Sequence, residues 1–186
     1  MFKLIGSTNI SQIVAGINQL TEQEWNKWKQ LQDLYKSHDS TLAYGLFFSM
    51  PDSESCYKVT IHDTTSPVAI ACKPVIDSLT AMYDTTPISA VFSCLRERRV
   101  IPIHTDPMYD GIHRIHIPII TNPMVYMFGE DLRLHRWKPG FMYDLDATKP
   151  HGIVNGSRLD RTHLVIDLPS TKAKKRIVYE PSGITV

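Results

Sequence analysis

From about residue 88 onward, short segments rich in Ile, Val, Phe and Tyr alternate with turns that contain Pro, Gly, Asp and Asn. Many short apolar segments between frequent turn residues are typical of a β-sandwich or barrel. No long helical pattern lies between them, which argues against a doubly wound parallel sheet. The expected strands in this region are 88–95, 100–104, 114–120, 124–128, 132–137, 141–144 and 162–168.

The first 85 residues mix helical and extended patterns. A helical period of apolar residues runs over 10–20, and Thr21-Glu22-Gln23-Glu24 has the form of a capping box before a stripe formed by Trp25, Trp28, Leu31 and Tyr35. Strands are expected at 41–49 and 57–61, and a short helix at 75–82. The predicted fold class is therefore mainly β with flanking helices (α+β): a double-stranded β-helix core of the jelly-roll or cupin type, with a helical N-terminal support.

Length and composition bound the organisation of the chain. We expect a single domain over 1–186, with the support at 1–85, the catalytic β core at 86–170 and a basic tail at 171–186. A net charge of +1 argues against a nucleic-acid partner, and the oligomeric state stays open. There is no apolar run long enough for a bilayer and no signal-peptide pattern, so we expect a cytoplasmic protein without a membrane partner. Three scattered cysteines fit free thiols in a reducing compartment.

One motif carries chemistry. His104-Thr105-Asp106 places two donor side chains on the same face of an extended strand, because side chains alternate with period two. His151 follows 45 residues after Asp106 and can complete a group of three ligands. Two imidazoles and one carboxylate with the opposite face open suit a non-heme Fe(II) that must also bind oxygen and a co-substrate.

Two further segments suit an anionic co-substrate. Arg161 begins the apolar strand 162–168, and an arginine in a buried strand is expensive unless an anion meets it. The far carboxylate of 2-oxoglutarate would supply that anion, since the guanidinium fork matches a carboxylate. Arg114 and His116 alternate onto one face of their strand, where they would suit the other carboxylate. A solvent-exposed face of an edge strand is the alternative for that pair.

The same residues resemble a known family. Over about residues 90–168 the chain is similar to the aspartyl/asparaginyl β-hydroxylase family of Fe(II)/2-oxoglutarate oxygenases, whereas the first 85 residues carry no resemblance that we identify. The matching motifs follow one another in the family's order: Phe92-Ser93, His104-Thr105-Asp106, Arg114-Ile115-His116-Ile117-Pro118, Trp137-Lys138-Pro139-Gly140, Asp146, His151, Arg161 and Val165-Ile166-Asp167.

The resemblance implies a role for each matched residue. His104, Asp106 and His151 would bind Fe(II) as the catalytic centre. Ser93 and Arg161 would hold the distal carboxylate of 2-oxoglutarate, and Arg114 and His116 its metal-proximal carboxylate. The implied reaction uses O2 to hydroxylate an unactivated C–H bond of an amino-acid side chain, in a free amino acid, a peptide or a protein, and produces succinate and CO2. Asp106 departs from the large animal members, which have glycine there, and the gap from His104 to Arg114 predicts a bulge or longer turn at Asp110-Gly111.

Other readings of the chain stay open. A cupin that binds metal without oxygenase activity, or a cupin enzyme independent of 2-oxoglutarate, would share the fold, because fold does not decide function. Arg161 discriminates between them, since a simple metal-binding cupin has no need of a buried cation. The remaining polar and aromatic residues are interpreted as follows: His113, His135 and His163 are not ligands, Asp144 and Asp146 are structural or orient a metal ligand, and Trp137 belongs to the core. Tyr109, Tyr126 and Arg158 are interpreted as residues of exposed loops, with the mouth of the substrate site as the alternative.

Overall fold

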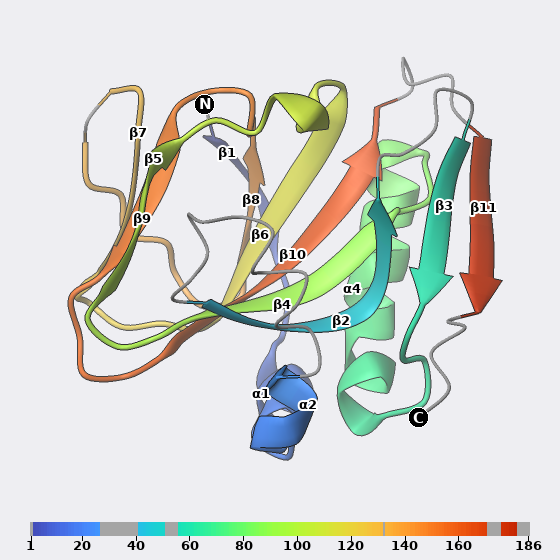
Figure 1. Ribbon diagram of the computed structural model, residues 1–186, viewed down its shortest axis with the longest axis horizontal. Helices are drawn as coiled ribbons and strands as arrows, with labels where there is room; N and C mark the ends of the chain where they lie inside the picture. Colours follow the sequence, from blue (N-terminus) through green and yellow to red (C-terminus); the bar gives the residue numbers. More distant parts are fainter. Residues whose placement is uncertain (1, 27–40, 51–55, 132, 171–175, 182–186) are drawn as a thin grey trace.

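The computed structural model describes residues 2–26, 41–50, 56–131, 133–170 and 176–181 (Figure 1). Most of the regular elements in the described part of the chain are strands. They are β1 (Phe2–Ser7), β2 (Thr41–Met50), β3 (Cys56–Ile61), β4 (Ser89–Leu95), β5 (Arg99–His104), β6 (Ile112–Ile120), β7 (Val125–Gly129), β8 (Phe141–Leu145), β9 (His151–Asn155), β10 (Arg161–Pro169) and β11 (Arg176–Pro181). The helices are α1 (Ser11–Ile17), α2 (Glu22–Asn26) and α4 (Pro67–Tyr83), with a 3-10 turn η2 (Pro107–Tyr109).

The strands form two sheets. The large sheet has the order β1-β8-β6-β10-β4-β2-β3-β11, and the small sheet has the order β5-β9-β7 (Figure 1). All of these pairings are antiparallel except that of β11 with β3. Side chains from both sheets line one cavity, so the small sheet lies over the end of the large one. This is the expected mainly β architecture of a double-stranded β-helix with flanking helices.

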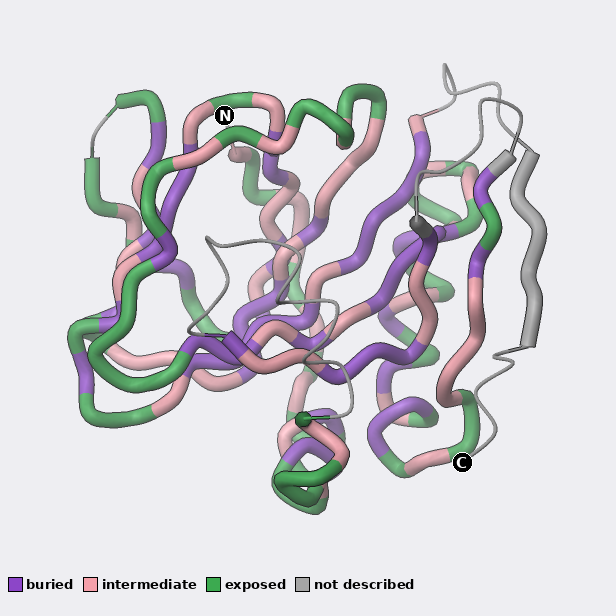
Figure 2. Tube along the Cα trace, in the orientation of Figure 1, coloured by how far each residue is buried: buried purple, intermediate pink, exposed green. Residues whose placement is uncertain are grey.

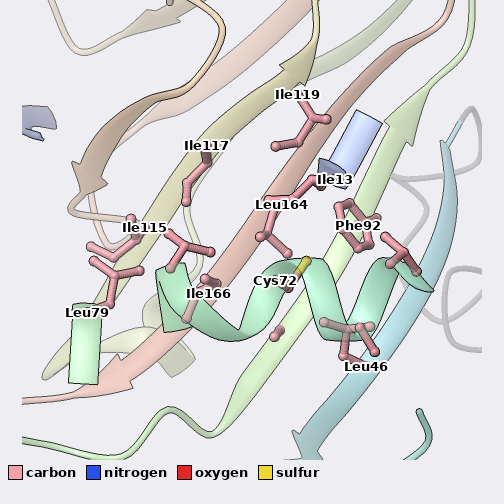
Figure 3. Close-up of a cluster of buried hydrophobic side chains, with 14 of the residues drawn as sticks. Ile13, Leu46, Cys72, Leu79, Phe92, Ile115, Ile117, Ile119, Leu164 and Ile166 are labelled. Atoms are coloured by element: carbon pink, nitrogen blue, oxygen red, sulfur yellow. The ribbon is translucent and has the colours of Figure 1, made fainter. Parts of the chain in front are cut away.

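The main hydrophobic core lies between the large sheet and the helices. Helix α4 crosses the outer face of the sheet and packs against the apolar side chains of β4, β6 and β10 (Figure 3). On β6 these are Ile115, Ile117 and Ile119, and on β10 they include Leu164 and Ile166. Strand β10 is buried along most of its length (Figure 2).

The opposite faces of the same strands point inward to the cavity. Arg114 and His116 of β6 line the cavity, as do Arg161, Val165 and Asp167 of β10. Because strand side chains alternate with period two, each residue of the core has a cavity-facing neighbour on either side. The packing of α4 against one face therefore fixes which side chains reach the other.

Helix α4 is longer than the sequence pattern indicated. It begins at Pro67 after Ser66, whose hydroxyl accepts a hydrogen bond from the backbone N–H of Ala69 at 3.1 Å, and it ends at Asp84 in the left-handed conformation. The helix expected at 75–82 is present, but it starts eight residues earlier, at Pro67, because a Ser cap followed by proline at the first helical position marks the earlier start.

Other sequence expectations have mixed outcomes. The capping box is confirmed, since the Thr21 N–H donates to the Glu24 carboxylate at 2.7 Å and the Glu24 N–H to the Thr21 hydroxyl at 3.3 Å. The expected strand at 132–137 is wrong: the described residues there form one isolated bridge, between Met127 and His135. Strands β1, β9 and β11 were not expected.

Some expectations concern residues whose side chains are not described. The stripe residues Trp28, Leu31 and Tyr35 and the basic segment 171–175 lie outside the described residues. Within the described part, Cys72 and Cys94 are buried free thiols, and we find no helix whose length and apolar character would let it span a membrane.

The turn Trp137-Lys138-Pro139-Gly140 offers a test of the fold. Gly140 has φ of +74°, and a Cβ there would lie 2.7 Å from the backbone oxygen of Thr8. Gly111 has φ of +73°, but its nearest neighbour would be the Ser170 hydroxyl at 3.7 Å. We expect Gly111→Ala to cost about 1–2 kcal/mol, the strain of the left-handed conformation alone. Gly140→Ala should cost about 2–4 kcal/mol, because the clash is added.

Urea unfolding of the two variants beside the unsubstituted chain measures both values. Equal destabilisation by the two substitutions would contradict the predicted contact between Gly140 and the segment that follows β1.

Candidate metal centre and anion-binding cavity

The histidines of the candidate metal centre are neighbours across the small sheet. Strand β5 ends at His104, β9 begins at His151, and the two residues are paired in the β5–β9 ladder. Their ring centroids lie 4.3 Å apart. Asp106 follows β5 by two residues, where its N–H donates to the carbonyl oxygen of Ala147 at 2.9 Å. Two separate segments of sequence thus converge on one point.

The donor atoms of the three side chains can serve one cation. One ligand atom from each of His104, Asp106 and His151 lies within 4.8 Å of the others. The Nε2 atom of His104 is 3.8 Å from Oδ1 of Asp106, and that of His151 is 3.9 Å from Oδ2. Two imidazoles and a carboxylate are a donor set that suits a divalent transition metal, and non-heme Fe(II) in particular.

Backbone carbonyls orient both imidazoles. Nδ1 of His104 lies 2.8 Å from the oxygen of Pro102, and Nδ1 of His151 lies 2.8 Å from the oxygen of Lys149. A carbonyl can only accept, so each Nδ1 donates to it, and each Nε2 is the ring nitrogen that faces Asp106. Burial lowers the pKa of His151, which favours the neutral imidazole that a metal requires.

Arg114 holds the aspartate of this group. Its Nη1–H donates to Oδ2 of Asp106 at 3.1 Å. Its Nε–H and Nη2–H donate to the two oxygens of Asp167 at 2.8 and 3.1 Å, and its guanidinium carbon lies 3.4 Å from the centre of the Tyr109 ring. Although burial opposes the charge, Asp167 and Asp106 outweigh it and raise the pKa of Arg114. The arginine is therefore fully compensated by carboxylates.

Arg161 has a different environment. It is 2% exposed, and its Nη2–H donates to Nδ1 of His163. Its Nε has no hydrogen-bond partner among the described residues, and no acidic side chain there forms an ion pair with it. Burial lowers the pKa of Arg161 to about 9. A buried guanidinium without an acidic partner among the described residues is suited to bind an anion.

Three neutral groups with unpartnered polar atoms surround Arg161. Nδ1 of His116, Nε1 of Trp137 and Nε2 of His163 are buried and lack a partner within the described part of the chain. Burial, followed by the charge of Arg161, lowers the pKa of both histidines well below the ordinary value. The ring centroids of His116, Trp137 and His163 lie 5.6 to 5.9 Å from one another. Unpaired polar atoms gathered in this way indicate a site for water or ligand.

The metal group and the buried arginine face the same cavity of about 200 Å³. The wall between them is largely apolar and comes from both sheets: Leu42, Phe48, Val91, Met127, Ile153 and Val165. Ser93 also lines the cavity, and it is paired across the β4–β10 ladder with His163. A small molecule that bears an anion at one end can therefore reach the metal group with the other end.

All seven sequence-predicted site residues line this one cavity: Ser93, His104, Asp106, Arg114, His116, His151 and Arg161. Arg114 faces the cavity beside His116 as expected, but its three hydrogen bonds go to carboxylates of the protein. His163 shares the face of Arg161 and is outside the group that could hold a metal.

Other residues lie partly where they were expected. Asp144 accepts from Tyr83 at 2.8 Å and contacts His113 at 2.9 Å, and Asp146 accepts from Thr148, so both are structural. Trp137 is 6% exposed and stacks on Tyr143, as expected of a core residue. For Tyr109 the exposed-loop interpretation was wrong and the alternative fits better, because the guanidinium of Arg114 covers its ring and the side chain lines the cavity.

The sequence analysis missed some residues of the cavity. Asp167 was noted only as the end of a motif, although a carboxylate inside an apolar strand signals a buried partner as clearly as Arg161 does. Leu42, Ala43 and Phe48 come from the N-terminal third, where no signal distinguished them from core residues. The turn expected at Asp110-Gly111 is present, with η2 before it and a positive φ at Gly111.

Comparisons with known proteins agree with this geometry. The model of the family described as aspartyl/asparaginyl beta-hydroxylase matches residues 8–171, which extends the resemblance well into the N-terminal third. No curated protein matches the sequence significantly.

Several solved structures share the fold. An oxidoreductase of the 2OG-Fe(II) oxygenase family from Burkholderia pseudomallei is 9% identical, with a TM-score of 0.53 over 91% of this chain and 95% of that one. A prolyl hydroxylase from Trichoplax adhaerens, in complex with a hypoxia inducible factor peptide fragment, is 10% identical, with a TM-score of 0.54 over 93% and 85%. The non-heme monooxygenase ThoJ in complex with Ni is 10% identical, with a TM-score of 0.56 over 92% and 74%. These similarities bear out the double-stranded β-helix fold.

The grouped donors predict a divalent metal site. Substitution of the residues that surround metal ligands typically weakens metal binding by about 10–100-fold. We expect His151→Ala, which removes a ligand itself, to weaken Co(II) binding to the metal-free protein by more than this. His135→Ala is the matched control, because His135 pairs with Asp131 away from the group. Isothermal titration with Co(II) gives both affinities, and equal losses in the two variants would contradict the assignment.

Arg161 is expected to lower the free energy of unfolding when no anion is bound to it. Arg161→Met removes a buried charge that lacks a carboxylate partner in the described structure. Without any dicarboxylate present, we expect the free energy of unfolding to rise by about 1–4 kcal/mol, as when other buried charges are replaced by apolar side chains. Arg96→Met, which breaks an exposed pair with Asp160, should change it by less than about 1 kcal/mol. Urea unfolding measures both, and a destabilised Arg161→Met variant would show that Arg161 is already compensated.

Proposed function

The chain belongs to the aspartyl/asparaginyl β-hydroxylase family, and from this membership and the geometry of the cavity we propose that it is an Fe(II)- and 2-oxoglutarate-dependent oxygenase. Its substrate would be an unactivated C–H bond of an amino-acid side chain. One observation carries the proposal: a His-Asp-His group and a buried arginine without a carboxylate partner among the described residues line the same cavity.

The residues of the metal group have a defined task in this proposal. His104, Asp106 and His151 hold the metal, and the carbonyls of Pro102 and Lys149 keep both Nε2 atoms directed at it. When bound, Fe(II) and 2-oxoglutarate supply the oxygen chemistry, with succinate and CO2 as co-products. Three protein ligands leave positions for a chelating co-substrate and O2.

The opposite end of the cavity binds the co-substrate. The guanidinium of Arg161, with the hydroxyl of Ser93, would take the distal carboxylate of 2-oxoglutarate. His116 and His163 remain neutral beside Arg161, so they add donors without a second positive charge. Because the guanidinium is already desolvated, the binding of a carboxylate there costs less than at an exposed arginine.

The substrate is proposed as a free amino acid or a residue of a peptide or protein. The apolar wall of Leu42, Val91, Met108 and Val165 supports a carbon chain beside the metal. The peptide bound by the Trichoplax prolyl hydroxylase supports a peptide as one candidate.

We propose that 1–186 functions as one oxygenase domain. Strands β2 and β3, from the first 85 residues, pair into the same sheet as β4, β6 and β10 of the β core. Leu42 and Phe48 of β2 line the cavity, so the N-terminal support contributes to the site directly.

An anaerobic visible spectrum tests the proposal. Addition of Fe(II) and then 2-oxoglutarate to the metal-free protein should produce a metal-to-ligand charge-transfer band that requires both additions and is lost in His151→Ala. Iron binding without the band would favour a metal-binding cupin or an enzyme independent of 2-oxoglutarate. Failure to bind iron would overturn the proposal.

The co-substrate site makes a further prediction. Arg161→Met should raise the 2-oxoglutarate concentration needed for half of the band by about 100-fold, because a buried charged contact typically contributes about 2–5 kcal/mol. Arg158→Ala is the control, since Arg158 is exposed and outside the cavity lining. An unchanged requirement in Arg161→Met would show that another group binds the distal carboxylate.

A further inference from the structure

The two arginines of the cavity have partners of opposite kinds. Arg114 donates to Asp106 and Asp167, whereas among the described residues the side-chain partner of Arg161 is the neutral His163. Both arginines are largely or fully buried and both belong to strands of the large sheet. Arg161 can therefore still bind an anion, whereas the N–H groups of Arg114 already donate to carboxylates of the protein.

We propose that Asp167 is a positioning residue for the metal ligand Asp106, acting through Arg114. This inference rests on the proposed function, because it takes Asp106 as a metal ligand.

Strand register makes the arrangement rigid. Arg114 of β6 and Asp167 of β10 are direct partners across the antiparallel ladder, so their side chains emerge together on the cavity face. Asp167 is 2% exposed, and its two oxygens meet the fork of Arg114 at 2.8 and 3.1 Å. A bidentate contact fixes the plane of the guanidinium and the direction of its remaining N–H groups.

Asp106 needs such a contact more than the histidines do. It lies beyond the end of β5, outside any strand, where its backbone N–H donates to Ala147 and its carbonyl oxygen accepts from the N–H of Tyr109. The Nη1–H of Arg114 donates to its Oδ2 at 3.1 Å, while its Oδ1 lies on the side of His104. Arg114 can therefore hold one carboxylate oxygen while the other is directed to the metal.

Charge leads to the same conclusion. The two carboxylates and one guanidinium of Asp106, Arg114 and Asp167 together carry a formal charge of about −1, which favours a dication. Without Asp167, Arg114 would cancel the charge of Asp106. The aspartate partner thus keeps the metal end of the cavity negative, whereas His163, which carries no charge, leaves Arg161 positive at the other end.

Metal binding to the metal-free full chain tests the proposal with Co(II) alone. Asp167→Asn keeps the shape of the side chain and removes its charge. We expect Co(II) affinity to fall by about 10–100-fold and the visible d–d absorption of the bound Co(II) to change, because the position of one ligand is altered. With the site saturated by Co(II), the dissociation constant of 2-oxoglutarate should change by less than about 3-fold, which is small beside the loss expected on removal of a buried charged contact. Asp160→Asn, at an exposed ion pair, should change neither quantity.

A second background separates positioning from a general structural effect. In Asp106→Ala protein, the further substitution Asp167→Asn should cause a smaller loss of Co(II) affinity than it does in the unsubstituted chain, because the ligand that it positions is gone and only the effect of its charge remains. Additive losses would overturn the inference. So would an Asp167→Asn protein that binds Co(II) normally and 2-oxoglutarate weakly, since Arg114 would then serve the co-substrate.

A conservative variant covers a failure of Asp167→Asn to fold. Arg114→Lys keeps the positive charge and removes the fork, and it should weaken Co(II) binding by about 10-fold or more. Unchanged Co(II) affinity in this variant would overturn the inference. Failure of the proposed function looks different: Asp106→Ala itself would then bind Co(II) as the unsubstituted chain does.

Discussion

Strands β6 and β10 lie between the α4 layer and the cavity, and this removes water as a partner for their polar side chains. Every charged side chain on the cavity face must therefore be paired with another group of the protein or with a bound ligand. Arg114 and Asp167 solve this for each other across the ladder. Arg161 has no acidic partner among the described residues, and the co-substrate binding proposed for the chain depends on its uncompensated charge.

The cavity is consequently divided by charge rather than by shape. The metal end combines Asp106, Arg114 and Asp167, and the anion end combines Arg161 with a neutral histidine. The proposed co-substrate 2-oxoglutarate has a chelating end and a carboxylate end, so it would span the cavity in one orientation. The same division distinguishes the two buried arginines of the cavity, since Arg114 is paired with carboxylates and Arg161 is paired with a neutral histidine.

The sequence was sufficient for the architecture and for residues whose chemistry is local. Turn residues between short apolar segments predicted the β core. The period of a strand predicted that His104 and Asp106 face the same point, and their donor atoms do lie together, although Asp106 lies beyond the end of β5. The sequence did not predict which residues pair across strands, because the β6–β10 register that joins Arg114 to Asp167 depends on sheet pairing. Strand 132–137 failed for a related reason: apolar residues alternate there, but the segment forms a single bridge to β7, and Trp137 packs in a separate core.

The packing of the two faces also explains how the fold tolerates this site. Arg161, His116, His163 and Trp137 each leave a buried polar atom without a partner in the described structure, and each such atom costs about 1–3 kcal/mol. The aliphatic residues of the same strands, including Ile115, Leu164 and Ile166, are fully buried against α4 and offset that cost. Substitutions in this core should therefore affect binding through register, because a shift of one residue would exchange the aliphatic and polar faces of β6 or β10. Stability and function here depend on the same strands but on alternate residues.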